Sequence, residues 1–362
     1  MRRRPGIMLI ALLWLATASA TQAAERLHFP ATGPVDGATD TLVVHGALDP
    51  SYARPLLEAF HAEHPSIGLT YRNLDTLGLH RRFLETPDEV DVLISSAMPW
   101  QYWLANGGHA RPLSSPQAMA WPAWARWRHE LFAFTFEPIV MVVRRELIDR
   151  FGRPESHAEL LELLEGHGEA LHGRVVTYDP ERSGAGYAYA IQESRLTPRY
   201  WDLVTAFGAT QTALAATTGE MLAGLKDGRY WLGYNLLGSY ARAVADADPA
   251  LEVVVPDDYA LITQRLALIP RQAPHPENAR RFMNFLLGDA GQRVIAEATP
   301  LGAVHPSLGG PGTAHALRES HGEALRPVSL GPGLLATLDE LKRQALLERW
   351  KREFTRTDAT SP

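Results

Sequence analysis

Residues 178–187 read Tyr178-Asp179-Pro180-Glu181-Arg182-Ser183-Gly184-Ala185-Gly186-Tyr187. A β-prone run, 173–178, leads into this segment and a helix-prone run, 187–196, follows it, so the pattern predicts a strand, a small-residue turn and a helix start. Such a turn directs backbone N–H groups and a hydroxyl at one point, where the helix dipole adds partial positive charge. Gly184 and Gly186 permit close backbone approach and positive φ. We interpret the segment as one side of a small-ligand site; an ordinary strand-to-helix connection is the alternative.

The chain before this segment alternates between β-prone and helix-prone runs. Strands are expected at 41–44, 67–73 and 90–94, and helices at 50–60, 74–85 and 100–106. Asp49 is a candidate N-cap, with Pro50 at the first helical position. This order predicts an α/β fold with a mostly parallel sheet and helices on both faces.

Two long apolar β segments divide the chain into lobes. The first, 131–144, is interrupted at Glu137-Pro138, and the second, 251–269, is broken at 256–258. We interpret them as outgoing and return crossovers, because strand-and-helix alternation restarts between them. The predicted organisation is a first lobe of 25–134 plus 265–330, a second lobe of 135–264, and a C-terminal helix and tail at 331–362, with the helix over 334–354.

The first residues have the features of a targeting segment. Three arginines at 2–4 precede an apolar run at 7–16 and the small-residue site Ala18-Ser19-Ala20, so we expect a signal peptide at 1–20, cleaved on export to the periplasm. Cleavage removes three arginines and no acid, which changes the formal charge from −6 to −9. Such an acidic protein is a poor candidate for binding nucleic acid. No further apolar run is long enough to span a membrane.

The absence of cysteine excludes thiol catalysis and cysteine-ligated zinc. A secreted α/β hydrolase is the enzymatic alternative, but no Gly lies two residues before Ser183, so the G-x-S-x-G pattern is missing. The histidines are scattered without ligand spacing. We therefore expect a protein that is not an enzyme and that has no metal site and no cofactor.

Several predicted strands end in loops of small or polar residues, and such loops meet at the carboxyl edge of an open α/β sheet. Facing each other across two lobes, they would form a pocket for a small anion, closed by a hinge motion. The candidate ligand-binding residues are His45, Gly46, Ser95, Ser96, Ser183, Gly184, Gly186, Tyr187, Asn235 and Tyr240. Each has a structural alternative: the serines at 95 and 96 as helix caps, the tyrosine at 187 as a packing residue, and the histidine as a scaffold residue.

Three motifs resemble one protein family. They are Glu89-Val90-Asp91-Val92-Leu93-Ile94-Ser95-Ser96-Ala97, the segment 178–187 described above, and the helix Pro276-Glu277-Asn278-Ala279-Arg280-Arg281-Phe282-Met283-Asn284-Phe285-Leu286-Leu287 followed by Gly291-Gln292. They resemble the extracellular solute-binding proteins that serve ABC importers, in the two-lobed group with crossed hinge strands. The resemblance covers about 42–306. It implies capture of a small solute between two lobes and an ABC permease or a membrane sensor kinase as the partner of a monomeric protein.

Within that group the chain is similar to two branches, the ferric-iron-binding proteins and the phosphoglycerate transport regulatory protein. The iron branch places two adjacent tyrosines in the last loop of the second lobe, where this chain reads Gly238-Ser239-Tyr240-Ala241 with one tyrosine. Ferric iron requires several anionic oxygen ligands. The long C-terminal extension looks more like the phosphoglycerate-type branch. We therefore expect a phosphorylated or carboxylated anion, with ferric iron as the alternative.

Overall fold

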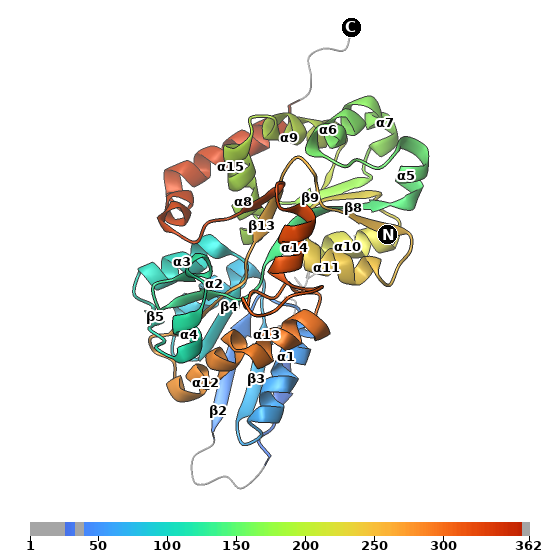
Figure 1. Cartoon of the computed structure of the whole chain (residues 1–362). Coiled ribbons are helices and arrows are strands. Elements are labelled where there is room, and N and C mark those ends of the chain that lie inside the picture. The colour runs from blue at the N-terminus through green and yellow to red at the C-terminus, as the bar shows by residue number, and fades with distance from the viewer. Residues whose placement is uncertain (1–25, 33–39, 357–362) are drawn as a thin grey trace, which may run out of the picture.

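The computed structural model describes residues 26–32 and 40–356, which form two lobes (Figure 1). The predicted signal peptide at 1–20 lies outside these residues. In Figure 1 the lower lobe combines the blue N-terminal elements with the orange helices α12 and α13, and the upper lobe is mainly green and yellow. The fold is therefore a mixed α/β architecture in which each lobe has its own sheet flanked by helices.

The first lobe is built on the sheet with strand order β1-β3-β2-β4-β14-β7-β6, and β5 also pairs with β14. Its strands are β1 (Arg26–Phe29), β2 (Thr41–Gly46), β3 (Gly68–Asn73), β4 (Val92–Ser95), β5 (Ala110–Arg111), β6 (Arg126–Trp127), β7 (Leu131–Ala133) and β14 (Leu266–Pro270). Its helices are α1 (Pro50–Glu63), α2 (Thr76–Glu85), α3 (Met98–Asn106), α4 (Pro116–Ala120), the 3-10 helix η1 (Ala123–Ala125), α12 (Pro276–Leu287) and α13 (Asp289–Ala298).

The second lobe is built on the sheet with order β10-β9-β11-β8-β13-β15, and β12 also pairs with β8. Its strands are β8 (Glu137–Arg144), β9 (Val175–Tyr178), β10 (Ala213–Ala215), β11 (Leu232–Leu237), β12 (Leu251–Val254), β13 (Ala260–Thr263) and β15 (Leu325–Pro327). Its helices are α5 (Arg145–Phe151), α6 (His157–Gly166), α7 (Gly168–Leu171), α8 (Gly184–Leu196), α9 (Tyr200–Ala209), α10 (Thr218–Lys226) and α11 (Gly238–Ala245).

The sheets are mixed rather than mostly parallel. The predicted strand-helix-strand units give the parallel pairs β2–β3, β2–β4, β9–β10 and β9–β11. The segments that cross between the lobes add antiparallel neighbours, because β14 runs back along β4 and β8 runs back along β11. The parallel strands still bring their carboxyl ends to the edge of each sheet that faces the other lobe.

Two short segments connect the sheet of one lobe to that of the other, before the C-terminal region adds further passages between the lobes. The first is 134–136, between β7 and β8, so Glu137-Pro138 begins a strand instead of interrupting one as the sequence suggested. The second is 264–265, between β13 and β14, because β12 ends before the 256–258 break and remains in the second lobe. The two segments contact each other: the backbone N–H of Phe134 donates to the carbonyl of Arg265 at 3.0 Å.

Helix α12 returns to the first lobe from far along the sequence and closes its core. Its apolar stripe buries Phe282 and Phe285, whose rings meet the ring of Phe60 in α1 edge-on, with centroids 5.1 and 5.6 Å apart. Burying a side chain of this size stabilises the fold by about 1.5–3 kcal/mol. The predicted periodicity of 276–287 is therefore that of a core helix.

The C-terminal region contacts both lobes. It contains α14 (Ala314–His321), β15, the 3-10 helix η2 (Pro332–Thr337) and α15 (Glu340–Phe354). The predicted helix over 334–354 is thus two elements, and the Asp339 side chain caps α15 by accepting from the N–H of Lys342. Strand β15, which the sequence places in the first lobe, pairs with β13 of the second. Helix η2 packs on α3 of the first lobe and α15 packs on α9 of the second.

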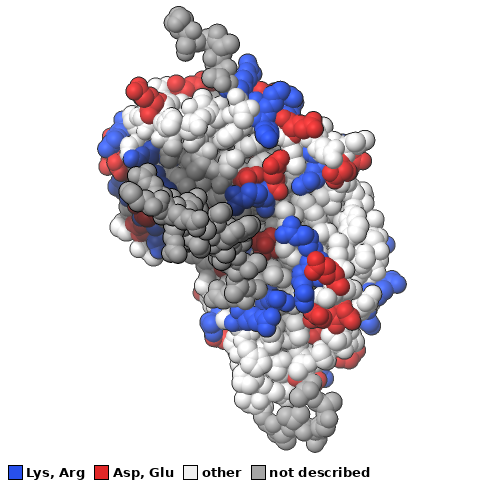
Figure 2. Space-filling view, turned by 180° about the vertical axis from the view of Figure 1, so that it is seen from behind, with Lys and Arg blue, Asp and Glu red and all other residues white. Residues whose placement is uncertain are grey.

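The face of the molecule opposite to that in Figure 1 carries mixed charge. On the face seen from behind, basic and acidic side chains of the described residues alternate over both lobes (Figure 2). Mixed charge of this kind differs from the clustered basic patch by which proteins bind nucleic acid. Within residues 26–32 and 40–356, no helix combines the length and apolar character needed to cross a membrane.

Candidate functional site

Arg265 lies at the centre of the contact between the lobes. It occupies the return crossover, its side chain is fully buried, and its Nη1 donates to the carbonyl of Ala47 at 2.8 Å, just beyond the end of β2. Its backbone N–H donates to Oγ1 of Thr135 in the outgoing crossover at 2.9 Å. A guanidinium is thus fixed where the strand ends and both crossovers converge.

Glu137 is the counter-charge of Arg265. Its Oε1 lies 3.0 Å from Nε of Arg265 and accepts from Oγ1 of Thr135 at 2.7 Å, while its Oε2 accepts from Oγ of Ser239. Burial disfavours the charged guanidinium, but Glu137 and the neighbouring tyrosines together outweigh this and raise the pKa of Arg265 above its usual value. Arg265 is therefore a permanent buried cation held by one buried carboxylate.

Five tyrosines surround this ion pair. Tyr52 and Tyr71 come from α1 and β3 of the first lobe, and Tyr178, Tyr189 and Tyr240 from β9, α8 and α11 of the second. Burial raises the pKa of Tyr178 to about 12 and raises the pKa of the other four phenols as well. At neutral pH all five are uncharged and can donate hydrogen bonds.

Tyr240 joins the two lobes. Arg265 lies over its ring, with the guanidinium carbon 5.3 Å from the centroid, and the ring of Tyr52 lies 4.4 Å away. Its hydroxyl oxygen accepts from the backbone N–H of Asp49 at 2.9 Å. On the other side of the interface, a Cβ added at Gly184 of α8 would lie 3.0 Å from Oγ1 of Thr76 in α2, so the lobes meet there too.

Three buried polar atoms of this cluster have no hydrogen-bond partner among the described residues: Nε and Nη2 of Arg265 and the hydroxyl of Tyr189. Of these, Nε is still in ion-pair contact with Glu137, so in the part of the chain that the structure describes Nη2 and the phenol are the two without a partner of either kind. The Tyr189 hydroxyl lies beside Thr263, which acts to lower the pKa of this phenol. The two side chains do not meet in the geometry of a hydrogen bond. Leaving a buried donor unpaired costs about 1–3 kcal/mol, and more for a charged group. An unpaired guanidinium nitrogen in the return crossover and an unpaired phenol in α8 of the second lobe are features expected of a site that receives acceptor atoms from a ligand.

The structure brings some predicted site residues to this cluster. Tyr240 is part of it, and Gly46 lies directly behind Tyr71, because a Cβ at Gly46 would collide with that ring. Gly184 and Gly186 have ordinary helical backbone rather than positive φ. They are needed for close packing instead: a Cβ at Gly186 would lie 2.5 Å from Cβ of Tyr178.

Two of the three predicted serines make the local hydrogen bonds at helix starts that their structural alternative expects. Oγ of Ser183 accepts from the N–H of Gly186 at 3.1 Å and caps α8, which begins at Gly184 rather than at Tyr187. Oγ of Ser95 accepts from the N–H of Ala97 at 3.1 Å at the start of α3. Ser96 is buried beside it.

Three other predicted residues face elsewhere. The hydroxyl of Tyr187 donates to the carbonyl of Thr337 in the C-terminal region. Asn235 belongs to β11, which runs to Leu237 instead of ending before it, and its Nδ2 donates to Oε2 of the buried Glu193 at 2.7 Å. His45 does not supply charge at a pocket mouth, because burial, then Arg72, lower its pKa from 6.5 to about 4.

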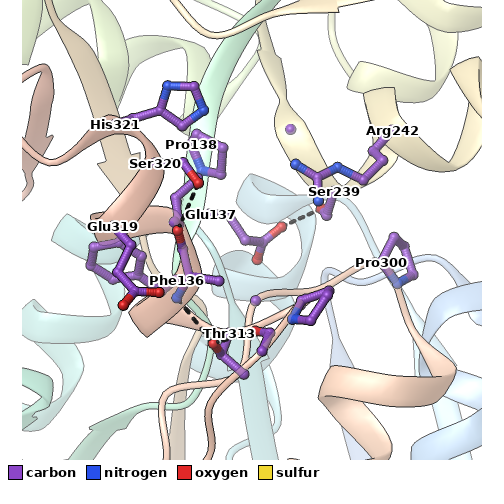
Figure 3. A pocket seen from close by; sticks show the side chains of 17 residues that line it. Phe136, Glu137, Pro138, Ser239, Arg242, Pro300, Thr313, Glu319, Ser320 and His321 are labelled. Atoms are coloured by element: carbon purple, nitrogen blue, oxygen red, sulfur yellow. Dashed lines mark hydrogen bonds between the residues drawn. The ribbon is translucent and has the colours of Figure 1, made fainter.

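A separate cavity of about 450 Å³ lies at the hinge (Figure 3). Its walls come from 136–138, from Ser239 and Arg242 of α11, and from α14. Figure 3 shows the Glu137 carboxylate directed at Ser239, so this carboxylate separates the cavity from Arg265. None of the five tyrosines lines the cavity. We therefore place the candidate ligand site at Arg265 and the tyrosines.

Comparisons with known proteins agree with this architecture. The sequence model of the family described as bacterial extracellular solute-binding protein matches residues 41–298. The substrate-binding protein of an ABC transporter from Agrobacterium tumefaciens is 37% identical, with a TM-score of 0.86, and the match covers 92% of this chain and 99% of that one. A comparison with curated proteins found no match.

Two further solved structures share the fold at lower identity. Iron-bound HitA from Pseudomonas aeruginosa is 16% identical with a TM-score of 0.67, covering 86% of this chain and 99% of its own. AfuA from Actinobacillus pleuropneumoniae, with exogenous fructose-6-phosphate bound, is 15% identical with a TM-score of 0.68, covering 88% and 99%. Two lobes, two crossovers and the matched family region lead to one conclusion: the chain belongs to the bacterial extracellular solute-binding proteins, the non-catalytic components that capture a small solute and deliver it to an ABC transporter permease.

Proposed function

We propose that the protein binds a small anionic solute, phosphorylated or carboxylated, with the acidic group on Arg265. The observation that carries the proposal is the buried Nη2 of Arg265, which has no partner among the described residues. An arginine offers two parallel N–H donors to a carboxylate or a phosphate, and such charge-assisted bonds are about twice as strong as neutral ones. The neutral hydroxyl of Tyr189 is a further donor at the same place.

Ferric iron is the alternative ligand, because iron-bound HitA shares the fold. AfuA also shares the fold and carries a sugar phosphate instead. The donor set favours the anion. Iron(III) is held by anionic oxygens, whereas here α11, which follows β11 directly, offers one tyrosine, Tyr240, and a permanent cation lies against its ring. In the described residues, no three acidic or histidine side chains come together at metal-binding distances.

The remaining parts of the proposal concern where and how the protein acts. Residues 1–20 direct export to the periplasm and are cleaved, and the mature chain acts as a monomer. Its partner is an ABC permease. A membrane sensor kinase that recognises the closed, ligand-bound protein is the alternative partner. The crossovers at 134–136 and 264–265 supply the hinge for closure, and binding at Arg265 acts directly on both because this residue bonds to Thr135.

Calorimetry and thermal shift with a panel of sugar phosphates, phosphoglycerates, dicarboxylates and ferric citrate test the proposal. A matching anion at about 100 times its Kd stabilises the fold by about 2.7 kcal/mol and raises Tm. Arg265→Lys keeps the buried charge but loses the paired donors, and we expect at least tenfold weaker binding. Arg293→Lys, at an exposed ion pair with Asp289, is the control. Binding that is equally strong in Arg265→Lys overturns the assignment.

A further inference from the structure

The hinge cavity has walls from both lobes. The second lobe supplies 136–138 at the start of β8 and, from α11, Ser239 and Arg242, while the chain that follows α13 of the first lobe supplies Pro300 and Gly302. Helix α14 forms the outer wall. The volume of about 450 Å³ is typical of small-ligand pockets, which range from about 300 to 1,000 Å³. The function proposed at Arg265 makes no use of this cavity.

Glycines bring the backbone of the cavity walls close together. A Cβ at Gly302 would collide with the carbonyl oxygen of Phe136, and one at Gly238 would lie 2.7 Å from that of Pro138. The N–H of Phe136 also donates to the carbonyl of Gly302 at 2.8 Å. At Gly310, by contrast, φ is 83° and an added Cβ would meet no atom within 4 Å. Packed backbone thus bounds an open space, which favours a pocket that is formed before a ligand arrives.

Much of the lining is apolar. Phe136 is buried, and its ring meets that of Trp124 edge-on with centroids 5.7 Å apart. The guanidinium carbon of Arg318 lies 4.4 Å from the centroid of Phe136. The other apolar side chains of the wall are Pro138, Pro300, Pro311, Ala316 and Leu317. Such walls suit a ligand with an apolar body, because its surface is then removed from water.

The charges around the cavity leave an excess of cations. Glu137 is neutralised by its ion pair with the return crossover, and Glu319 lies 3.3 Å from Nδ1 of His315 on α14. Arg242 forms no hydrogen bond or ion pair with a described residue, and Figure 3 shows its side chain reaching from α11 toward the side of the cavity where Ser239 lies. Arg318 likewise has no acidic partner among residues 26–32 and 40–356. An anionic group is therefore favoured at this rim.

We propose that the hinge cavity is a second ligand site, which takes a small monoanion with an apolar body, such as an aromatic or cyclic carboxylate. The carboxylate accepts from the guanidinium of Arg242, and the body packs against Phe136 and Pro138. The carboxylate of Glu137 separates this site from Arg265, so each site can be occupied while the other is empty. Because both lobes form its walls, the occupant lies where the hinge bends.

Calorimetric titration of four probes into the wild type tests the site. Benzoate and cyclohexanecarboxylate have both features, acetate lacks the apolar body, and benzamide lacks the charge. We expect at least one of the two cyclic carboxylates to bind at least fivefold more tightly than acetate and benzamide. Its binding should weaken at moderate salt, because Arg242 is an exposed charge.

Two variants locate the binding. Arg242→Gln should weaken binding of the cyclic carboxylate at least fivefold and change any binding of benzamide by less than threefold. Ala316→Phe, which fills part of the cavity from α14, should weaken binding of both. Arg280→Gln, at an exposed ion pair with Glu277, is the matched control and should bind like the wild type. Circular dichroism checks that Ala316→Phe is folded; if it is not, Arg242→Gln decides the test.

The outcomes separate this site from the one proposed at Arg265. Equal binding in the wild type and Arg242→Gln, or no binding of either cyclic carboxylate at millimolar concentration, overturns the second site. Binding that is lost in Arg265→Lys but retained in Arg242→Gln and Ala316→Phe places the carboxylate at Arg265 and also overturns it. The function proposed at Arg265 is tested with its own panel of solutes, so it is neither supported nor overturned by failure of the hinge cavity to bind.

Discussion

Nε of Arg265, in the return crossover, lies 3.0 Å from Oε1 of Glu137, which begins β8 directly after the outgoing crossover. The pair therefore does more than balance a buried charge. Any rotation of one lobe against the other changes the relation between the two crossovers, and the guanidinium that we propose as the ligand's partner is the same group that holds them together. We therefore expect ligand binding and hinge geometry to be coupled through this ion pair.

Replacing Glu137 by Gln tests this coupling. The change preserves shape but leaves Arg265 buried without its counter-charge, and breaking a buried pair in this way costs about 3–5 kcal/mol. We expect the free energy of unfolding in urea to fall by that amount. The affinity for a small anion should rise severalfold, because Nε of Arg265 is released from Glu137. Thr313→Val, at the wall of the hinge cavity, serves as a control for the anion titration.

A Glu137→Gln protein that is as stable as the wild type would contradict the buried ion pair. Weaker anion binding in a folded Glu137→Gln protein would show that Glu137 positions Arg265 rather than competes for it.

Tyr187→Phe separates packing from ligand binding. The Tyr187 hydroxyl donates to Thr337 in the C-terminal region, and its ring contacts Trp100 of α3 with centroids 5.8 Å apart. Removing the hydroxyl leaves a buried carbonyl without this donor, so we expect a loss of about 1 kcal/mol in unfolding free energy. The Kd for a bound solute should change by less than threefold, whereas Arg265→Lys changes it at least tenfold. A tenfold loss of affinity in Tyr187→Phe would return this residue to the ligand site.

The sequence predicted the parts of the fold that leave a periodic or local signal. Apolar runs ending in small polar loops identified β2, β4 and β9, and the stripe of Phe282 and Phe285 identified α12 as a core helix. Apolar runs also located the two crossover regions, but not their breaks. The break at 264–265 falls on the polar residues Gln264 and Arg265, which are as buried as their apolar neighbours, so the apolar segment as a whole was taken for one strand.

The centre of the site was missed for the same reason. Arg265 and Glu137 are 128 positions apart in the chain, and no local spacing connects them. The available signal was a single arginine inside the apolar run 259–269, where a charge has to be paired to be buried. The tyrosines at 52, 71 and 189 likewise occupy ordinary helix and strand positions.

Several predicted site residues have structural partners in the fold, which shows a different limit of sequence reasoning. Serine, asparagine and tyrosine after a strand are suited to bind a ligand, but the same groups also cap helices and satisfy buried acids. Asn235 is the clearest case: it adopts a positive φ of 65° and donates to Glu193, a carboxylate 42 positions earlier in α8. Only the fold, which brings Glu193 to Asn235, distinguishes an asparagine that binds a ligand from one that pairs with a buried acid.

Because His45 is buried, we expect the folded protein to lose stability in mild acid. Burial and the neighbouring Arg72 lower its pKa from 6.5 to about 4 in the folded protein. The unfolded chain therefore binds a proton first as pH falls, and stability is lost between about pH 6.5 and 4. For this group alone, about 2–3 kcal/mol should be lost between pH 7.5 and 4.5. In urea titrations at the two pH values, His45→Gln should lack this part of the loss, and the exposed His315→Gln should keep it. An identical pH dependence in His45→Gln would contradict the buried neutral imidazole.

Ferric iron and an anion make different demands on Tyr240. An iron site requires the phenol as an anion, but burial raises its pKa, and its hydroxyl oxygen already accepts from the N–H of Asp49. We expect no visible tyrosinate-to-iron absorption band when purified protein is mixed with ferric citrate at neutral pH. Tyr240→Phe should weaken anion binding by less than Arg265→Lys does, because the ring that packs on Arg265 and Tyr52 is retained. A band that forms in the wild type and disappears in Tyr240→Phe would replace the anion with iron as the ligand, since only direct coordination by this phenol could produce it.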